Sequence, residues 1–206
     1  IPAHMYYACL DGSWNDDGDL RWGEPGEDDL FAEVIIGRFA VEDSVEIAHM
    51  THKQIMYQDQ PVVDDIEKAL MIGESLDSYT WGGDSKDEVA DGSSNHGHVT
   101  AGVSANFAVE YLYERDQWWN KTHVFGQFNT TGVNLLNHLG HSNTTYNMKM
   151  YNSDVTTSNF TNDGVTRGYP IGYSQGCYNG AFDNRGTTPN SYGSDCFAEK
   201  ITTIET

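Results

Sequence analysis

One cysteine in this chain stands where a reactive thiol would be useful. Cys177 follows an apolar and aromatic run at 169–176 and precedes an Asn-Gly turn, and His141 follows a second apolar run at 133–140. A thiol becomes a strong nucleophile when it ionises, and a nearby imidazole favours the thiolate. By themselves, these residues leave two interpretations open: a nucleophile paired with a base, or a small side chain that only packs in the core.

Glycines beside both residues fit a substrate site. Gly140 and Gly176 directly precede the imidazole and the thiol, and glycine lets the backbone turn sharply and approach a ligand closely. If the two strands are parallel neighbours, their carboxyl ends bring His141 and Cys177 to one crevice. Backbone N–H groups at Ser142 and Gly176 would then be available to stabilise a developing oxyanion.

The elements that must position these residues alternate along the chain. Hydrophobic periodicity predicts strands at 32–39, 68–74, 106–114, 133–140 and 169–176, and helices at 42–58, 121–129 and 194–206. Asp43 or Ser44 is expected to cap the first helix, and a Ser-Asp pair to cap the last. The Gly-, Ser- and Asp-rich segment at 75–98 is expected to be a long loop. This alternation predicts an α/β fold with a mostly parallel central sheet flanked by helices.

Composition narrows the function classes. The 206 residues suffice for one domain with a core, and 31 acidic against 11 basic residues give a net charge of −20. Such a surface repels nucleic acid and anionic membranes, and no apolar run is long enough to span a bilayer. Three cysteines without a CxxC pair argue against a disulfide scaffold or a zinc knuckle. Because the chain starts at Ile1 and stops in a predicted helix, we expect residues 1–206 to be a single catalytic-domain fragment, truncated at both ends. The oligomeric state stays open.

Three segments resemble the gingipain family of secreted cysteine peptidases, whose members have a caspase-like fold. They are GVNLLNHLGHSNTTYN at 132–147, GYSQGCYNGAFDN at 172–184 and DCFAEKIT at 195–202. The shared features are an apolar strand ending in Gly-His, a strand ending in Cys-x-Asn-Gly-x-Phe, and Cys-Phe-Ala-Glu opening a helix. The resemblance implies a three-layer α/β sandwich.

The resemblance also implies a role for each reactive residue. Cys177 matches the family nucleophile and His141 its general acid/base, so the implied reaction is peptide-bond hydrolysis through an acyl-enzyme. Glu74, which ends the predicted strand MIGE, matches a third, acidic residue that would orient His141; a solvated glutamate is the alternative. The implied partner is a protein or peptide substrate, and the implied location is secreted or on the cell surface.

A specificity residue is harder to choose. The family places an acidic residue for substrate binding in a loop that corresponds to 81–92, where Asp84, Asp87 and Asp91 all qualify. A carboxylate at the bottom of a pocket would favour an Arg or Lys side chain, and we prefer Asp87. A hydrated acidic loop with no such role stays open.

An acidic loop at 11–29 suggests calcium. Its oxygen-bearing side chains at alternate positions resemble half of a calcium loop; the expected ligands are Asp11, Asn15, Asp17, Asp19 and Glu24. The full EF-hand pattern fails because no Glu stands at the twelfth position. A solvated loop is the alternative, although structural calcium is also implied by the resemblance. His138 and His141 point to opposite faces of a strand, so we expect no zinc site there.

A different class of function competes with the peptidase. Ser142 stands where the family commonly has Gly, and its side chain could crowd an oxyanion contact. The insertion at 184–194 is longer than expected, and the strands that follow the last helix in the family are absent, so part of the substrate cleft is expected to lie outside this piece. These departures fit a catalytically inactive, calcium-binding surface or adhesion module with the same fold.

Overall fold

The computed structural model describes residues 4–183 and 193–206. The chain forms two compact units, Ile1–Ala40 and Val41–Thr206, and each is treated by itself below. The prediction of a single catalytic-domain fragment stays a prediction. None of the helices in the described ranges is both long enough and apolar enough to cross a membrane.

The larger unit is built on a parallel sheet, as predicted. Its four strands lie in the order β2-β1-β3-β6, and each neighbouring pair is parallel. The strands are β1 (Lys68–Gly73), β2 (Ala108–Tyr113), β3 (Leu135–Leu139) and β6 (Ile171–Gln175), and a separate hairpin pairs β4 (Tyr146–Asn147) with β5 (Met150–Tyr151). Four of the five predicted strands are therefore confirmed, each slightly shorter than expected.

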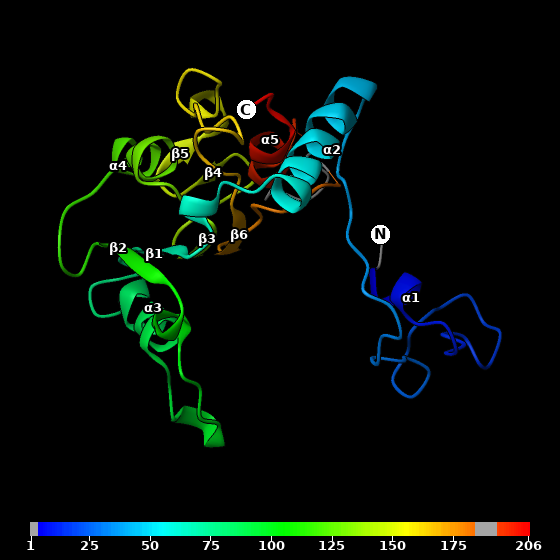
Figure 1. Cartoon of the computed structure of the whole chain (residues 1–206). Helices are drawn as coiled ribbons and strands as arrows, with labels where there is room; N and C mark the ends of the chain where they lie inside the picture. Colours follow the sequence, from blue (N-terminus) through cyan, green and yellow to red (C-terminus); the bar gives the residue numbers. More distant parts are fainter. Residues whose placement is uncertain (1–3, 184–192) are drawn as a thin grey trace. The chain divides into compact units, whose positions relative to one another are not determined.

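Alternating side chains give the sheet two apolar faces. On one face, Leu70 and Ile72 join a core with Phe128, which follows helix α4 (Lys121–Gly126), and Phe197, which begins helix α5 (Phe197–Thr203). On the other face, Ala69 and Met71 join a second core that includes Ala90 of helix α3 (Gly82–Asp91). Figure 1 shows α3 on one side of the sheet and α4 and α5 on the other. The result is the predicted α/β arrangement with helices on both faces.

The helices match the predictions in part. Helix α2 (Ser44–Asp59) begins where expected, and its N-cap is Asp43, whose carboxylate accepts the Val45 and Glu46 N–H groups. Helix α4 (Lys121–Gly126) continues into a π-helical turn at Gln127–Thr131. The other helices are α1 (His4–Ala8), α3 (Gly82–Asp91), α5 (Phe197–Thr203) and short 3₁₀ turns at Val63–Asp65, Asn95–Gly97, Val103–Ala105 and Asn152–Asp154.

The cap of α5 differs from the expected Ser-Asp pair. Its N-cap is Cys196, and the Glu199 carboxylate accepts the Cys196 backbone N–H at 2.8 Å. The helix therefore begins three residues later than predicted, and a glutamate in its first turn accepts the N–H of the N-cap residue, which is one half of a capping box.

The expected loop at 75–98 contains a ten-residue helix instead. Helix α3 buries Lys86 and Ala90, which lie four residues apart on one face, and its first glycine sits so close to the sheet that a Cβ on Gly82 would be 2.5 Å from the Leu139 carbonyl oxygen. The periodicity is hidden in the sequence because a lysine occupies a buried position and two glycines open the helix.

The expected strand at 32–39 is also wrong. The structure has no strand there, and Ile35 is fully exposed. The smaller unit, over its described residues, holds only the short helix α1 and irregular segments. A β-branched run becomes a strand only where a neighbouring strand pairs with its backbone and a core covers its side chains, and this segment has neither.

Candidate active site

The ends of β3 and β6 carry the two residues singled out in the sequence. The Gly140 N–H donates to the Gln175 carbonyl at 3.2 Å. A Cβ on Gly176 would lie 2.3 Å from the Ser142 hydroxyl oxygen and 3.3 Å from the Gly140 carbonyl. The segments that contain His141 and Cys177 therefore pack directly against each other, as the prediction of adjacent parallel strands requires.

Cys177 is the exposed cysteine of the three. Cys9 and Cys196 are buried, and all three are free thiols. Burial raises the pKa of Cys196 to about 11, which makes that thiol inert at neutral pH. Next to Cys177, Tyr178 has a left-handed backbone with φ of 61°. Strained backbone of this kind at a non-glycine residue is concentrated at functional sites.

Glu74 reaches His141 through the backbone. The Glu74 carboxylate is buried, one of its oxygens accepts the His141 backbone N–H at 3.2 Å, and the other lies 3.2 Å from Nε2 of His138. We predicted a carboxylate that orients the His141 ring. The contact that the structure shows instead fixes the turn from which His141 projects.

A second carboxylate, that of Glu114, lies within the electrostatic influence of His141, and the sequence analysis missed it. Burial acts to raise the pKa of Glu114, but hydrogen bonds from the Lys149 ammonium and the Ser75 N–H, with the charges of Lys149 and His141, hold that pKa below its usual value. The Ser75 N–H donates to Glu114 at 2.7 Å. No sequence pattern pointed to Glu114, because its partners lie 35 and 39 residues away.

Ser142 does not direct its hydroxyl into free space. Its Oγ donates to the Cys177 carbonyl at 2.7 Å, so the serine that replaces the usual glycine forms a hydrogen bond between the two strand-end segments. Whether Ser142 and Gly176 contribute backbone N–H groups to an oxyanion site stays a prediction.

The sequence matches the model of peptidase family C25 over residues 1–206. The chain belongs to peptidase family C25. This family is the gingipain family that the two strand-end motifs indicated. No curated protein matches the sequence.

Two solved structures share the fold of this C25 chain. The crystal structure of gingipain R (RgpB), described as an Arg-specific cysteine proteinase, is 21% identical with a TM-score of 0.62, and the match covers 85% of this chain. The complex of the pro- and mature domains of RgpB from Porphyromonas gingivalis is 23% identical with a TM-score of 0.55, and the match covers 84% of this chain. In both cases the match covers 37% of the other chain. These likenesses confirm the predicted fold.

The predicted specificity residue of this C25 chain already has a partner. Asp87 lies on α3, and its carboxylate is 2.7 Å from Nη1 of Arg115, which also lies 2.5 Å from Asp84. A basic substrate side chain would have to compete with Arg115 for both carboxylates. The pairing works against the role predicted for Asp87, although that role stays a prediction.

The predicted calcium ligands converge only in part. Oxygen atoms of Asp17, Asp19 and Glu24 lie within 4.8 Å of one another. Asp11 lies outside this group, and Asn15 uses its side-chain oxygen to accept the Gly18 N–H at 2.9 Å. Calcium takes six to eight oxygen ligands, including water. The two exposed aspartates and the half-buried glutamate would leave the remaining ligand positions to water.

Proposed function

We propose that this chain carries the catalytic residues of a secreted or surface-located cysteine endopeptidase. The observation that supports the proposal is the direct packing of the two strand-end segments, with an exposed Cys177 on one and an exposed His141 on the other. Membership of family C25 supports the same class of chemistry. The substrate is a protein or peptide.

The proposed reaction runs in two halves. The Cys177 thiolate attacks the carbonyl carbon of the scissile bond, and the His141 imidazolium donates its proton to the departing amine, which leaves an acyl-enzyme. His141 then takes a proton from water, the resulting hydroxide attacks the acyl carbon, and the thiolate is released. Glu74 holds the backbone of His141 during both halves.

A Cys177→Ala variant tests the proposal. Turnover of a mixed peptide library should fall by about 10³-fold or more, because the nucleophile is lost, while a Cys196→Ser variant should keep its activity if it folds. A His141→Ala variant should show a comparable loss. Equal cleavage by the native chain and by Cys177→Ala would rule out the peptidase.

A second candidate is supported by the convergent carboxylates of the smaller unit. In this alternative, the chain is an inactive, calcium-binding surface or adhesion module that keeps the fold without the chemistry. Rapid and selective alkylation of Cys177 at neutral pH would argue against it, since an inert thiol reacts slowly.

Calcium binding itself is compatible with either function, and we propose it for Asp17, Asp19 and Glu24. Calorimetric titration of the native chain with CaCl₂ should show one site, and an Asp17→Asn/Asp19→Asn variant should lose it, because two of the three charged ligands become neutral. Asp16→Asn, which removes a neighbouring charge outside the group, is the matched control. Equal binding by all three proteins would contradict the assignment.

A further inference from the structure

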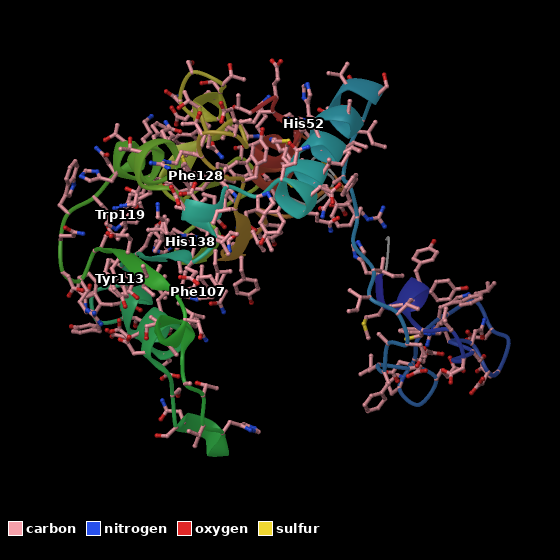
Figure 2. All side chains as sticks on the ribbon, in the orientation of Figure 1. His52, Phe107, Tyr113, Trp119, Phe128 and His138 are labelled. Atoms are coloured by element: carbon pink, nitrogen blue, oxygen red, sulfur yellow. The ribbon has the colours of Figure 1, made fainter. Side chains whose placement is uncertain are left out.

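A set of polar side chains lies beneath the two strand ends; Glu74, His138 and Asn147 are buried, and Ser174 and Asn179 are half-buried. His138 on β3 is fully buried, with Nε2 3.2 Å from the Glu74 carboxylate and Nδ1 2.8 Å from the Ser174 hydroxyl on β6. The same hydroxyl accepts amide N–H groups from Asn179 at 2.8 Å and Asn147 at 3.0 Å. We call these five residues the buried network. Figure 2 shows His138 inside the packed body of the larger unit.

Both ring nitrogens of His138 have a hydrogen-bonding partner, the Glu74 carboxylate at Nε2 and the Ser174 hydroxyl at Nδ1. The Ser174 hydroxyl also lies 3.3 Å from the side-chain oxygen of Asn147. Ser174 therefore shares its hydrogen-bonding capacity among His138, Asn147 and Asn179. No polar atom of the buried His138 ring is left unpaired, as buried polar groups require.

The two ends of the buried network connect to the two proposed catalytic segments. At one end, Glu74 accepts the His141 backbone N–H at 3.2 Å. At the other end, Asn179 lies two residues after Cys177, and its carbonyl accepts the Ala198 N–H at 2.8 Å. His138 is therefore a further link between the turn that holds His141 and the turn that holds Cys177, beneath the Ser142–Cys177 hydrogen bond.

The order Ser-His-Glu also resembles a nucleophile triad, but the surroundings exclude that use. The exposure of His138 is 0%, and the Ser174 oxygen is surrounded by the three partners that occupy its hydrogen-bonding capacity. The His138 ring is therefore closed to a substrate, and the Ser174 hydroxyl is engaged with its partners. The network can fix positions, but it cannot attack a carbonyl.

We propose that His138 is a positioning residue that couples the backbone of His141 to the turn after Cys177 through Glu74 and Ser174. An effect of this coupling on catalysis rests on the proposed peptidase function. The geometry that it maintains is independent of activity. Loss of either hydrogen bond of His138 loosens one catalytic segment relative to the other.

Two near-isosteric variants separate the two hydrogen bonds. His138→Gln keeps a donor near the position of Nε2 and loses the partner of Ser174, whereas His138→Asn keeps a group near Nδ1 and loses the donor to Glu74. In His138→Asn, hydrogen exchange at the His141 amide should accelerate by about tenfold or more, and in His138→Gln it should stay near the native rate. Amides of β1, such as those of Leu70 and Ile72, are the control for global stability.

The effect on the Cys177 segment is measured separately, by the rate at which Cys177 is alkylated. The rate of Cys177 alkylation by iodoacetamide should change in His138→Gln more than in His138→Asn, because only the former disconnects Ser174. If the chain is an active peptidase, both variants should lower kcat with little change in KM, since the substrate contacts remain. The exchange and alkylation measurements decide the proposal even if Cys177→Ala shows that there is no peptidase activity.

A Ser174→Ala variant covers the case in which His138 variants do not fold. It removes one oxygen from a half-buried position and should speed Cys177 alkylation with β1 exchange unchanged. The proposal is overturned if local exchange at His141 and alkylation at Cys177 stay at native rates in the folded variants. Changes that appear equally at His141, Leu70 and Ile72 would also overturn it, because they would show that His138 only contributes to packing.

Discussion

Gly140 is where the candidate site has the least room. A Cβ at this position would lie 2.4 Å from Nε2 of His138 and 2.5 Å from the carboxyl carbon of Glu74. The absence of a side chain therefore lets Glu74, His138 and the backbone of His141 come together. This need for close approach, rather than an unusual φ angle, explains the glycine.

A Gly140→Ala variant should lose both stability and activity. Inserting one methyl group into this packed contact should lower the free energy of unfolding by about 1–3 kcal/mol, and kcat should fall because Glu74 can no longer hold the His141 backbone. Urea unfolding and peptide turnover measure the two effects. Gly180→Ala is the control, since a Cβ there meets no atom within 4 Å. Equal effects of the two substitutions would contradict this explanation.

At the residue scale, the sequence revealed local patterns but not distant pairings. The apolar runs before His141 and Cys177 are visible in the sequence, so their positions after adjacent strands could be predicted. The contact of His138 with Glu74 joins residues 64 positions apart, and its contact with Ser174 joins residues 36 apart. Nothing in the local pattern identifies such partners. The pairing of Asp87 with Arg115 was missed for the same reason.

At the element scale, α2 is held to α5 by polar contacts. His49 Nδ1 lies 2.9 Å from the Thr203 carbonyl, and the Lys53 ammonium donates to the Thr202 carbonyl at 3.2 Å. Both carbonyls belong to the last turn of α5, where main-chain oxygens have no helical partner. Burial lowers the pKa of Lys53 to about 8 from its ordinary value of 10.5.

The lowered pKa of Lys53 predicts a pH dependence. Below about pH 8, this lysine is charged in the folded and unfolded states, and folding carries the full cost of burying the charge. As the pH rises from about 8 to 10.5, the folded state loses the proton first, so this cost disappears. The stability of the native chain relative to Lys53→Met should therefore rise across that range, as measured by urea unfolding. A difference that stays constant with pH would contradict the assignment.

The elements that were predicted correctly have a strong pattern of apolar residues and pack against a hydrophobic core. β1 is a near-continuous apolar run, as a buried parallel strand should be, and three of the five residues of β3 are leucines. The run at 32–39 is also apolar, but it pairs with no strand and was wrongly predicted as one. Helix α3 packs against the sheet, but its apolar pattern is weak, so the sequence did not indicate it. Periodicity reports which side chains prefer burial, and tertiary contacts decide whether burial is available.

At the scale of the whole molecule, the net charge of −20 is the dominant electrostatic feature. Like charges repel within a compact structure, and this repulsion is reduced by dissolved salt. The melting temperature should therefore rise by a few degrees, about 2–5 °C, when NaCl is increased from low to moderate concentration. Differential scanning calorimetry measures the shift. An equal increase in an added neutral osmolyte controls for effects other than screening, and a fall in melting temperature with salt would contradict the prediction.

The order of the strands has a consequence for biosynthesis. Strands β2, β1 and β3 form three adjacent positions of the sheet, and β6, the last strand along the chain, lies at the edge beside β3. A chain that emerges from the ribosome N-terminus first can assemble the three-stranded part, with Glu74 and His138 in contact, before β6 exists. Cys177 is then added last, at the rim of a sheet already formed. A newly made molecule would therefore bring Cys177 beside the His141 segment only after Glu74 and His138 are in place.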